Sequence, residues 1–186
     1  MLQKIKSYIK FLWNSKNEHG VHSPFVFDLV TKCFYDKSKN PEYSLLKNNS
    51  KKIRLLFRII RYFKPKTILE IGNPTELDTN MFSSEIISFE DFKKNKLSNN
   101  DSTFDLVYFN QNESQKATIE YFNLLLPTIT NDAVWIINDI HTSTENKNTW
   151  EIIKKHPKVK VTIDTFHFGM VFFRAEQEKE HFVIRV

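Results

Sequence analysis

Apolar residues recur at helical spacing in the first third of the chain. Positions three or four apart predict amphipathic helices over three segments, residues 2–13, 24–35 and 51–64. Ser23 followed by Pro24 favours the start of the second helix, because serine caps a first turn and proline fits its first position. We therefore expect a helical N-terminal extension over residues 1–64.

The first of these helices combines an apolar stripe with several lysines. Its apolar positions recur at helical spacing: Leu2, Ile5, Ile9, Leu12 and Trp13. A helix of this kind usually docks its apolar face on its own domain. It can also contact a partner or lie on a membrane surface, and the sequence leaves these alternatives open.

Short apolar runs alternate with helical segments beyond residue 65. Four runs predict strands: TILEI at 67–71, EIISFE at 85–90, FDLVYFN at 104–110 and AVWIIN at 133–138. Helical patterns follow Ser114 and surround Trp150. Because strands separated by helices form parallel sheets through right-handed crossovers, we expect a parallel sheet here.

The end of the chain has a different pattern. The runs KVKVTID (158–164) and GMVFFR (169–174) are joined by only four residues, TFHF, so they predict an antiparallel pair. The final EHFVIRV adds a further edge segment. Together these patterns predict an α/β fold with a mostly parallel sheet, an antiparallel C-terminal strand pair and a compact unit over residues 65–186.

Composition narrows the class of protein. A chain of 186 residues with 40% hydrophobic content is long enough for one domain with a sizeable core. Its one cysteine, Cys33, cannot form an internal disulfide. Neither a secretory signal nor a run of about 18 apolar residues is recognisable, so we expect a cytoplasmic protein without a membrane span.

Basic residues exceed acidic ones by 27 to 22, which favours anionic partners weakly. Four of them recur along the third predicted helix: Lys51, Arg54, Arg58 and Arg61. This basic stripe could contact phosphate groups, but it lacks interleaved aromatic residues and any nucleic-acid-binding motif. A solvated helix face is the preferred interpretation, and no specific nucleic-acid binding is expected.

The order of these elements resembles the class I S-adenosylmethionine (SAM)-dependent methyltransferases, most closely their small-molecule O-methyltransferase-like branch. The resemblance covers most of the chain outside residues 73–103. It is carried by five segments: HGVHSPFVF (19–27), KTILEIG (66–72), FDLVYFN (104–110), EYFNLLLPTITNDAVWIINDIH (120–141) and HPKVKVTIDTFHFGMVFFRAEQEKEHF (156–182). It implies a Rossmann-like sheet with ligands bound beyond the carboxyl ends of the parallel strands.

The first motif matches the family only in part. Glu70 and Gly72 match the acidic residue and the first glycine that follow the first strand. Pro74 and Glu76 stand near the later glycine positions. Proline offers no N–H to a ligand carboxylate, and glutamate adds bulk and like charge, so we expect weak binding of the amino-acid end of SAM.

The second motif combines a matching acid with a deletion. Glu90 follows Glu70 by 20 residues, as does the family's acid that holds the ribose hydroxyls, although it could equally be ordinary loop charge. Only residues 73–103 separate Gly72 from the next matching strand, whereas one crossover unit takes about 30 residues. We therefore predict that the family's third strand and its adenine wall are missing.

The strand ends that hold a metal in some members are altered. Asn110 stands where the pattern has an aspartate, and Asn138 precedes Asp139 where the pattern has a pair of acidic or amide residues. One carboxylate and two amides make a poor divalent-cation site, so we expect no metal. Asp139 and His141 could form an acid/base pair, although such a loop motif more often caps and packs.

These observations lead to two hypotheses. The first is a methyltransferase-like protein with a degraded SAM site, non-catalytic and acting as a binding or assembly module. In this hypothesis the edge at Glu85–Glu90 is exposed by the missing third strand and binds a protein partner or a second copy. The alternative is an active SAM-dependent O-methyltransferase on a small molecule, with Glu70, Gly72, Glu90 and Asn110 at the cofactor and Asp139 and His141 near the acceptor.

Overall fold

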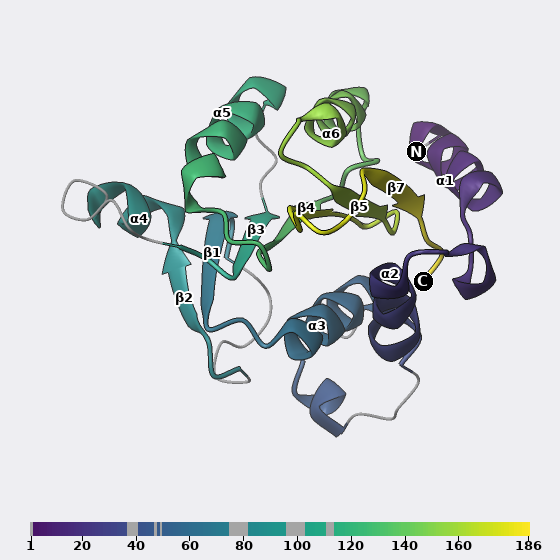
Figure 1. Ribbon diagram of the computed structural model, residues 1–186, viewed down its shortest axis with the longest axis horizontal. Coiled ribbons are helices and arrows are strands. Elements are labelled where there is room, and N and C mark those ends of the chain that lie inside the picture. The colour runs from purple at the N-terminus through teal and green to yellow at the C-terminus, as the bar shows by residue number, and fades with distance from the viewer. Residues whose placement is uncertain are drawn as a thin grey trace.

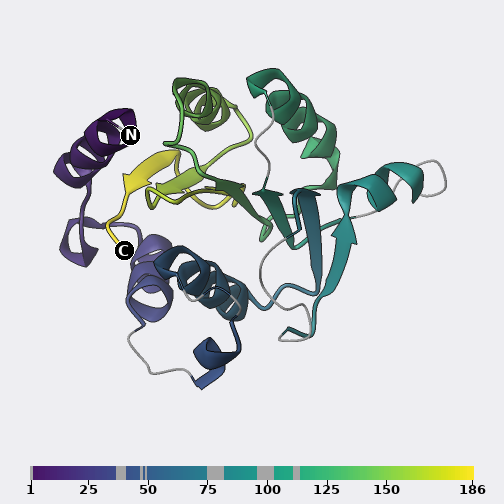
Figure 2. The same ribbon diagram turned by 180° about the vertical axis from the view of Figure 1, so that it is seen from behind.

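A computed structural model describes residues 2–36, 41–46, 48, 50–74, 82–95, 103–110 and 114–186. Seven strands in this part of the chain form one sheet, and helices cover both of its faces (Figure 1, and from behind in Figure 2). This mixed sheet, together with the helices of the N-terminal segment, confirms the predicted α/β, Rossmann-like class.

Helices α2 and α3 begin where their capping serines predict. This segment contains α1 (Leu2–Asn14), the 3-10 turn η1 (Glu18–Gly20), α2 (Pro24–Leu29), the π-helical turn η2 (Val30–Phe34), the 3-10 helix η3 (Pro41–Leu45) and α3 (Lys51–Phe63). The Ser23 hydroxyl accepts a hydrogen bond from the Val26 N–H, and Ser50 caps α3 in the same way through Ile53. Lys64 ends α3 in the left-handed conformation, with φ 47°.

The sheet contains both predicted kinds of pairing. Its strands are β1 (Thr67–Gly72), β2 (Glu85–Ser88), β3 (Leu106–Asn110), β4 (Val134–Asn138), β5 (Val161–Asp164), β6 (Phe168–Phe172) and β7 (Glu180–Val183). They lie in the order β2-β1-β3-β4-β6-β5-β7. The first four pair in parallel, β6 is antiparallel to β4 and β5, and β7 is parallel to β5.

Three further helices pack on one face of the sheet: α4 (Phe89–Asn95), α5 (Gln115–Leu125) and α6 (Thr144–Lys155) (Figure 1). Helices α2 and α3 cover the other face. Alternate strand residues point to these two layers: Ile136 packs in the cluster beneath α3, whereas Trp135 packs in the cluster with α5 and α6. The N-terminal helices therefore share one hydrophobic core with the sheet.

Helix α4 corrects the predicted extent of the second strand. The run EIISFE was expected to be extended to Glu90, but the strand ends at Ser88 and the chain turns directly into a helix. The Ser88 hydroxyl accepts a hydrogen bond from the Asp91 N–H at 3.1 Å and so caps the new helix. Glu90 therefore lies in the first turn of α4.

Helix α1 docks on the domain through a different face from the predicted stripe. Ser7 and Phe11 are buried, whereas Ile5, Ile9 and Trp13 are exposed, Trp13 to 89%. The prediction of a helix was correct, but Ile5, Ile9 and Trp13 of its apolar stripe face outwards, because Phe11 is the residue that packs against Phe166 and His141. Within the described residues, no helix has both the length and the apolar character needed to span a bilayer.

Strand β2 lies at one edge of the sheet. In the described part of the chain its hydrogen-bonded neighbour is β1 alone. Residues 75–81, which include Glu76, and residues 96–102 lie outside the described residues. The missing third strand therefore stays a prediction.

Candidate functional site

The carboxyl ends of β1, β3 and β4 lie side by side at one edge of the sheet, because these strands pair in parallel. Gly72 ends β1 directly opposite Asn110, which ends β3. Asn138 ends β4 on the other side of β3. Loops beyond such adjacent strand ends are where open α/β sheets bind ligands.

A chain of amide hydrogen bonds connects these three strand ends. The Asn110 side-chain amide donates to the Asn73 carbonyl at 2.9 Å, and its carbonyl oxygen accepts from the Asn138 side chain at 2.8 Å. The Asn73 N–H donates in turn to the Asn110 carbonyl at 3.0 Å. Gly72 has φ 91°, a backbone conformation that only glycine adopts readily.

The acidic residues of the β1–β2 end are arranged differently. Glu70 is half-buried within β1. Glu90 is 70% exposed, and its carboxylate lies 2.5 Å from the Lys93 ammonium on the same helix. Pro74 is exposed after the turn and has no N–H to offer to a ligand.

Two ion pairs lie farther along the same edge of the sheet, beyond the carboxyl ends of β4 and β5. The Asp139 carboxylate lies 2.9 Å from the Lys52 ammonium of α3. Asp139 has φ 54°, and its N–H donates to the His167 carbonyl at 2.8 Å. The Asp139 carbonyl accepts a hydrogen bond from the Asn146 side chain, which ties the loop to α6.

The second pair joins His141 Nε2 to Asp164 Oδ2 at 2.7 Å, with the two side chains only 18% and 11% exposed. The other oxygen of Asp164 accepts the Phe166 N–H at 2.8 Å. The Phe166 ring stacks on the imidazole at 5.1 Å, and the Phe11 ring meets it edge-on at 6.2 Å. An imidazole oriented by a carboxylate and shielded by rings has the arrangement of a general base.

Asp139 and His141 are thus each paired with a residue that the sequence did not indicate. Asp139 contacts Lys52, and His141 contacts Asp164. The structure pairs Asp139 and His141 with these two residues rather than with each other, and both stand at the carboxyl edge of the sheet.

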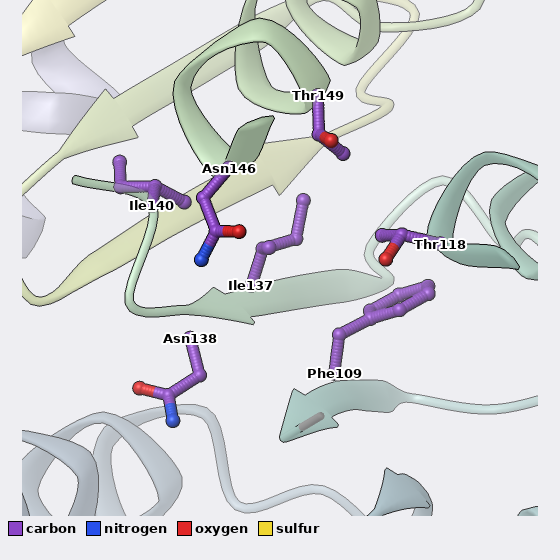
Figure 3. Close-up of a pocket in the computed structure, with 7 residues that line it drawn as sticks. All are labelled: Phe109, Thr118, Ile137, Asn138, Ile140, Asn146 and Thr149. Atoms are coloured by element: carbon purple, nitrogen blue, oxygen red, sulfur yellow. The ribbon is translucent and has the colours of Figure 1, made fainter. Parts of the chain in front are cut away.

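A small cavity lies between β3, β4, α5 and α6 (Figure 3). Its volume is ≈ 20 Å³, enough for one water molecule. The Thr118 and Thr149 hydroxyls on its wall donate to carbonyls of their own helices. Asn138 points away from the side of the sheet on which Phe109 and Ile137 lie. The cavity is too small for an organic ligand.

Among the residues that the structure describes, no group of three or more histidine, cysteine, aspartate or glutamate residues is placed to hold a metal ion. Cys33 is buried, and burial raises the pKa of its thiol to about 12. A thiol of this kind is not a nucleophile near neutral pH. Neither a metal centre nor thiolate chemistry is built from these residues.

Comparison with known proteins shows the fold. No family model matches the sequence, and no curated protein matches it. The methyltransferase PaMTH1 of Podospora anserina, solved with S-adenosylhomocysteine (SAH), is similar in structure with 12% identity and a TM-score of 0.50, over 91% of this chain and 94% of that one. The chain has a methyltransferase fold.

Two O-methyltransferases are similar to a lower degree. TomG of Streptomyces achromogenes, solved with SAM, has 12% identity and a TM-score of 0.47, over 78% of this chain and 95% of that one. An enzyme from Bacillus cereus, solved with SAH, has 11% identity and a TM-score of 0.42, over 72% and 95%. Identities this low describe the methyltransferase fold and not the reaction.

Two residues of these ion pairs, Asp164 and Lys52, were not indicated by the sequence pattern. Asp164 ends β5, so its place at the carboxyl edge was readable from the strand that it terminates. Lys52 lies 87 residues from Asp139, and its contact depends on how α3 packs beneath the sheet. No local pattern reveals such a pair.

Proposed function

We propose that this protein is a methyltransferase-like binding module that does not transfer methyl groups efficiently. The main support is the chain of amide hydrogen bonds between Asn73, Asn110 and Asn138. These bonds occupy the side chain that would have to turn towards a nucleoside at the end of β3. A ligand entering there would have to break bonds that the apoprotein already makes.

The groups that would hold SAM give further support. A methyl donor needs a glycine turn for its amino-acid end, an acid for its ribose and a wall for its adenine. Gly72 keeps the turn's left-handed backbone, but Pro74 lacks a donor. The Glu90 carboxylate is engaged with Lys93 on an exposed helix face. We therefore expect SAM to bind weakly at best.

Strand β2 is the surface through which the module would associate. Ile86 and Ile87 are half-buried and flanked by exposed Glu85 and Ser88. A sheet edge of this kind offers N–H and C=O groups to an added strand. The partner is another protein or a second copy of this chain.

A titration calorimetry experiment tests the cofactor part of the proposal. SAM and SAH are titrated separately to millimolar concentration into the protein and into Glu90→Ala. We expect no saturable heat with either protein. A dissociation constant in the micromolar range that rises about tenfold in Glu90→Ala would contradict the proposal, because it would show a working ribose contact.

Light scattering across a concentration series tests the edge in its self-association form. We expect dimers at high concentration, and we expect Ile87→Lys to remove them by placing a charge on the edge. Ile152→Lys is the matched control, since Ile152 is exposed on α6, away from β2. A monomer at every concentration, or equal loss in both variants, would rule out self-association through β2.

One observation favours an active small-molecule O-methyltransferase as the second candidate. The His141–Asp164 pair could deprotonate an acceptor hydroxyl while SAM supplies the methyl group. Incubation with SAM and simple phenols, followed by measurement of SAH, tests this candidate. SAH formed by the natural protein and lost in His141→Asn would establish it; equal background in both would exclude it for these acceptors.

A further inference from the structure

A second, larger cavity lies between α1, α3 and the turn that joins β5 to β6. Its volume is ≈ 270 Å³, close to the lower size of small-molecule sites, which begin at about 300 Å³. Four cationic side chains line it: Lys51, Arg54, Arg58 and Arg185. None of its lining residues is aspartate or glutamate.

The basic residues of α3 differ in whether they line this cavity. Arg61, outside the cavity, pairs with Glu42, and Lys52 pairs with Asp139. Lys51 and Arg185, which line the cavity, form no ion pair within the described residues. The helix dipole at the start of α3 adds positive potential beside Lys51.

Arg58 is held in place by the protein itself. Its Nε donates to the Cys33 carbonyl and its Nη2 to the Phe34 carbonyl, both at 3.1 Å. These bonds satisfy the carbonyls of the π-helical turn η2 and fix the guanidinium without neutralising its charge. The cationic side chains of this wall therefore repel one another, and no acidic side chain on the wall offsets that repulsion.

Three aromatic rings, those of Tyr8, Phe11 and Phe166, form part of the remaining wall. Phe166 meets the Tyr8 ring edge-on at 4.9 Å and lies 5.4 Å from the Phe11 ring. The same Phe166 stacks on His141, so this wall separates the cavity from the His141–Asp164 pair. Flat rings beside cations suit a ligand with a flat apolar body and a charged group.

We propose that this cavity binds a small organic anion that carries a phosphate or carboxylate on an aromatic body. Lys51 and Arg185 contact the anionic group, Arg58 provides fixed charge, and Tyr8 contacts the ring. The ligand class is that of a single-ring aromatic acid or phosphomonoester. This inference gives the proposed binding module a ligand class, and it rests on the cavity and not on the state of the SAM site.

The probe is phenyl phosphate, titrated by calorimetry at low ionic strength, with inorganic phosphate, benzoate and phenol in parallel. We expect one site per chain for phenyl phosphate, with benzoate next in affinity and inorganic phosphate about tenfold weaker than phenyl phosphate. We expect no binding of phenol. Raising the salt concentration should weaken phenyl phosphate binding, because exposed charges are screened.

Variants distinguish this cavity from general surface charge. Lys51→Gln and Arg185→Gln should each weaken phenyl phosphate binding about tenfold, as expected for losing one charge-assisted contact. Lys116→Gln on α5 is the matched control and should bind as the natural protein does, since Lys116 is exposed away from the cavity. Tyr8→Ala should remove the preference for phenyl phosphate over inorganic phosphate.

Circular dichroism and melting temperature confirm that each variant folds. The proposal is overturned if phenyl phosphate gives no saturable heat, if phenol binds as well as phenyl phosphate, or if Lys116→Gln weakens binding as much as Lys51→Gln. SAM is titrated into the same samples. If neither phenyl phosphate nor SAM binds, only the cavity proposal is overturned. If SAM binds tightly, only the proposal of a non-catalytic module is overturned.

Discussion

The centre of the sheet and its β2 edge differ in how deeply their strands are buried. Strand β6 is buried at every position, and β4 is buried at all but its last. Strand β2, at one edge, has no fully buried residue. The well-packed region therefore lies around β4 and β6, and the lightly packed region is the β2 edge.

The ion-paired side chains and the exposed candidate cofactor residues lie in different regions of the sheet. The two ion pairs lie beside the well-packed region and are formed by His141 with Asp164 and by Lys52 with Asp139. Pro74 follows β1 and Glu90 follows the edge strand β2, and both residues are exposed. Substitutions at such exposed positions can remove ligand contacts while the buried core stays intact.

The largest expected difference in stability is between truncations of one isoleucine in each of the two regions. Ile136 in β4 is fully buried, whereas Ile87 in β2 is half-buried. Ile136→Ala should lower the free energy of unfolding by about 2–5 kcal/mol, and Ile87→Ala by about 1 kcal/mol, because less apolar area is lost. Urea unfolding monitored by circular dichroism measures both. Equal losses would show that β2 is as firmly packed as β4.

The second comparison removes one carboxylate from each of the two regions. Asp164→Ala leaves both the Phe166 N–H and His141 without their acceptor, so it should destabilise by about 1–3 kcal/mol. Glu90→Ala removes an exposed pair and should change stability by less than about 0.5 kcal/mol. Asp164→Asn, which keeps an acceptor oxygen, should recover part of the loss. A larger loss of stability for Glu90→Ala than for Asp164→Ala would contradict the ranking of the two regions.

The smallest expected effect is a pH dependence that arises away from the β2 edge. All six histidines lie outside residues 23–140. Burial, with help from nearby lysines, lowers the pKa of His156 and His181. The folded state therefore binds fewer protons than the unfolded state, so stability is full above the unfolded pKa of about 6.5 and falls as the pH drops below it.

Solvent exposure limits this effect to below about 0.5 kcal/mol per histidine. Urea midpoints measured between pH 7.5 and pH 5 should decline for the natural protein. The decline should be smaller for the double variant His156→Gln with His181→Gln. An unchanged slope in the double variant would place the pH dependence in other groups.

The sequence predicted the order of the elements because that order follows local rules. Ser23 and Ser50 cap their helices, and strand-like runs alternate with helical ones. The helix that begins at Phe89 was missed, because its apolar residues continue the strand pattern and only the cap formed by Ser88 ends the strand. Local propensity does not decide between these two outcomes.

The candidate site was predictable only where a residue ends a strand. Gly72, Asn110 and Asn138 were found in this way, and their hydrogen-bonded contact follows from the parallel register. Which way α1 turns its apolar stripe depends on tertiary packing of Phe11. The cavity between α1 and α3 was therefore beyond any argument from sequence pattern.

Trp13 gives the molecule an optical probe of its first helix. The sequence has three tryptophans; Trp135 and Trp150 are enclosed in the core, whereas Trp13 stands in solvent. A collisional quencher such as iodide should therefore extinguish the emission of one indole and spare the other two. The quenchable fraction reports on α1, and the protected fraction reports on the sheet, so one spectrum follows both parts during unfolding.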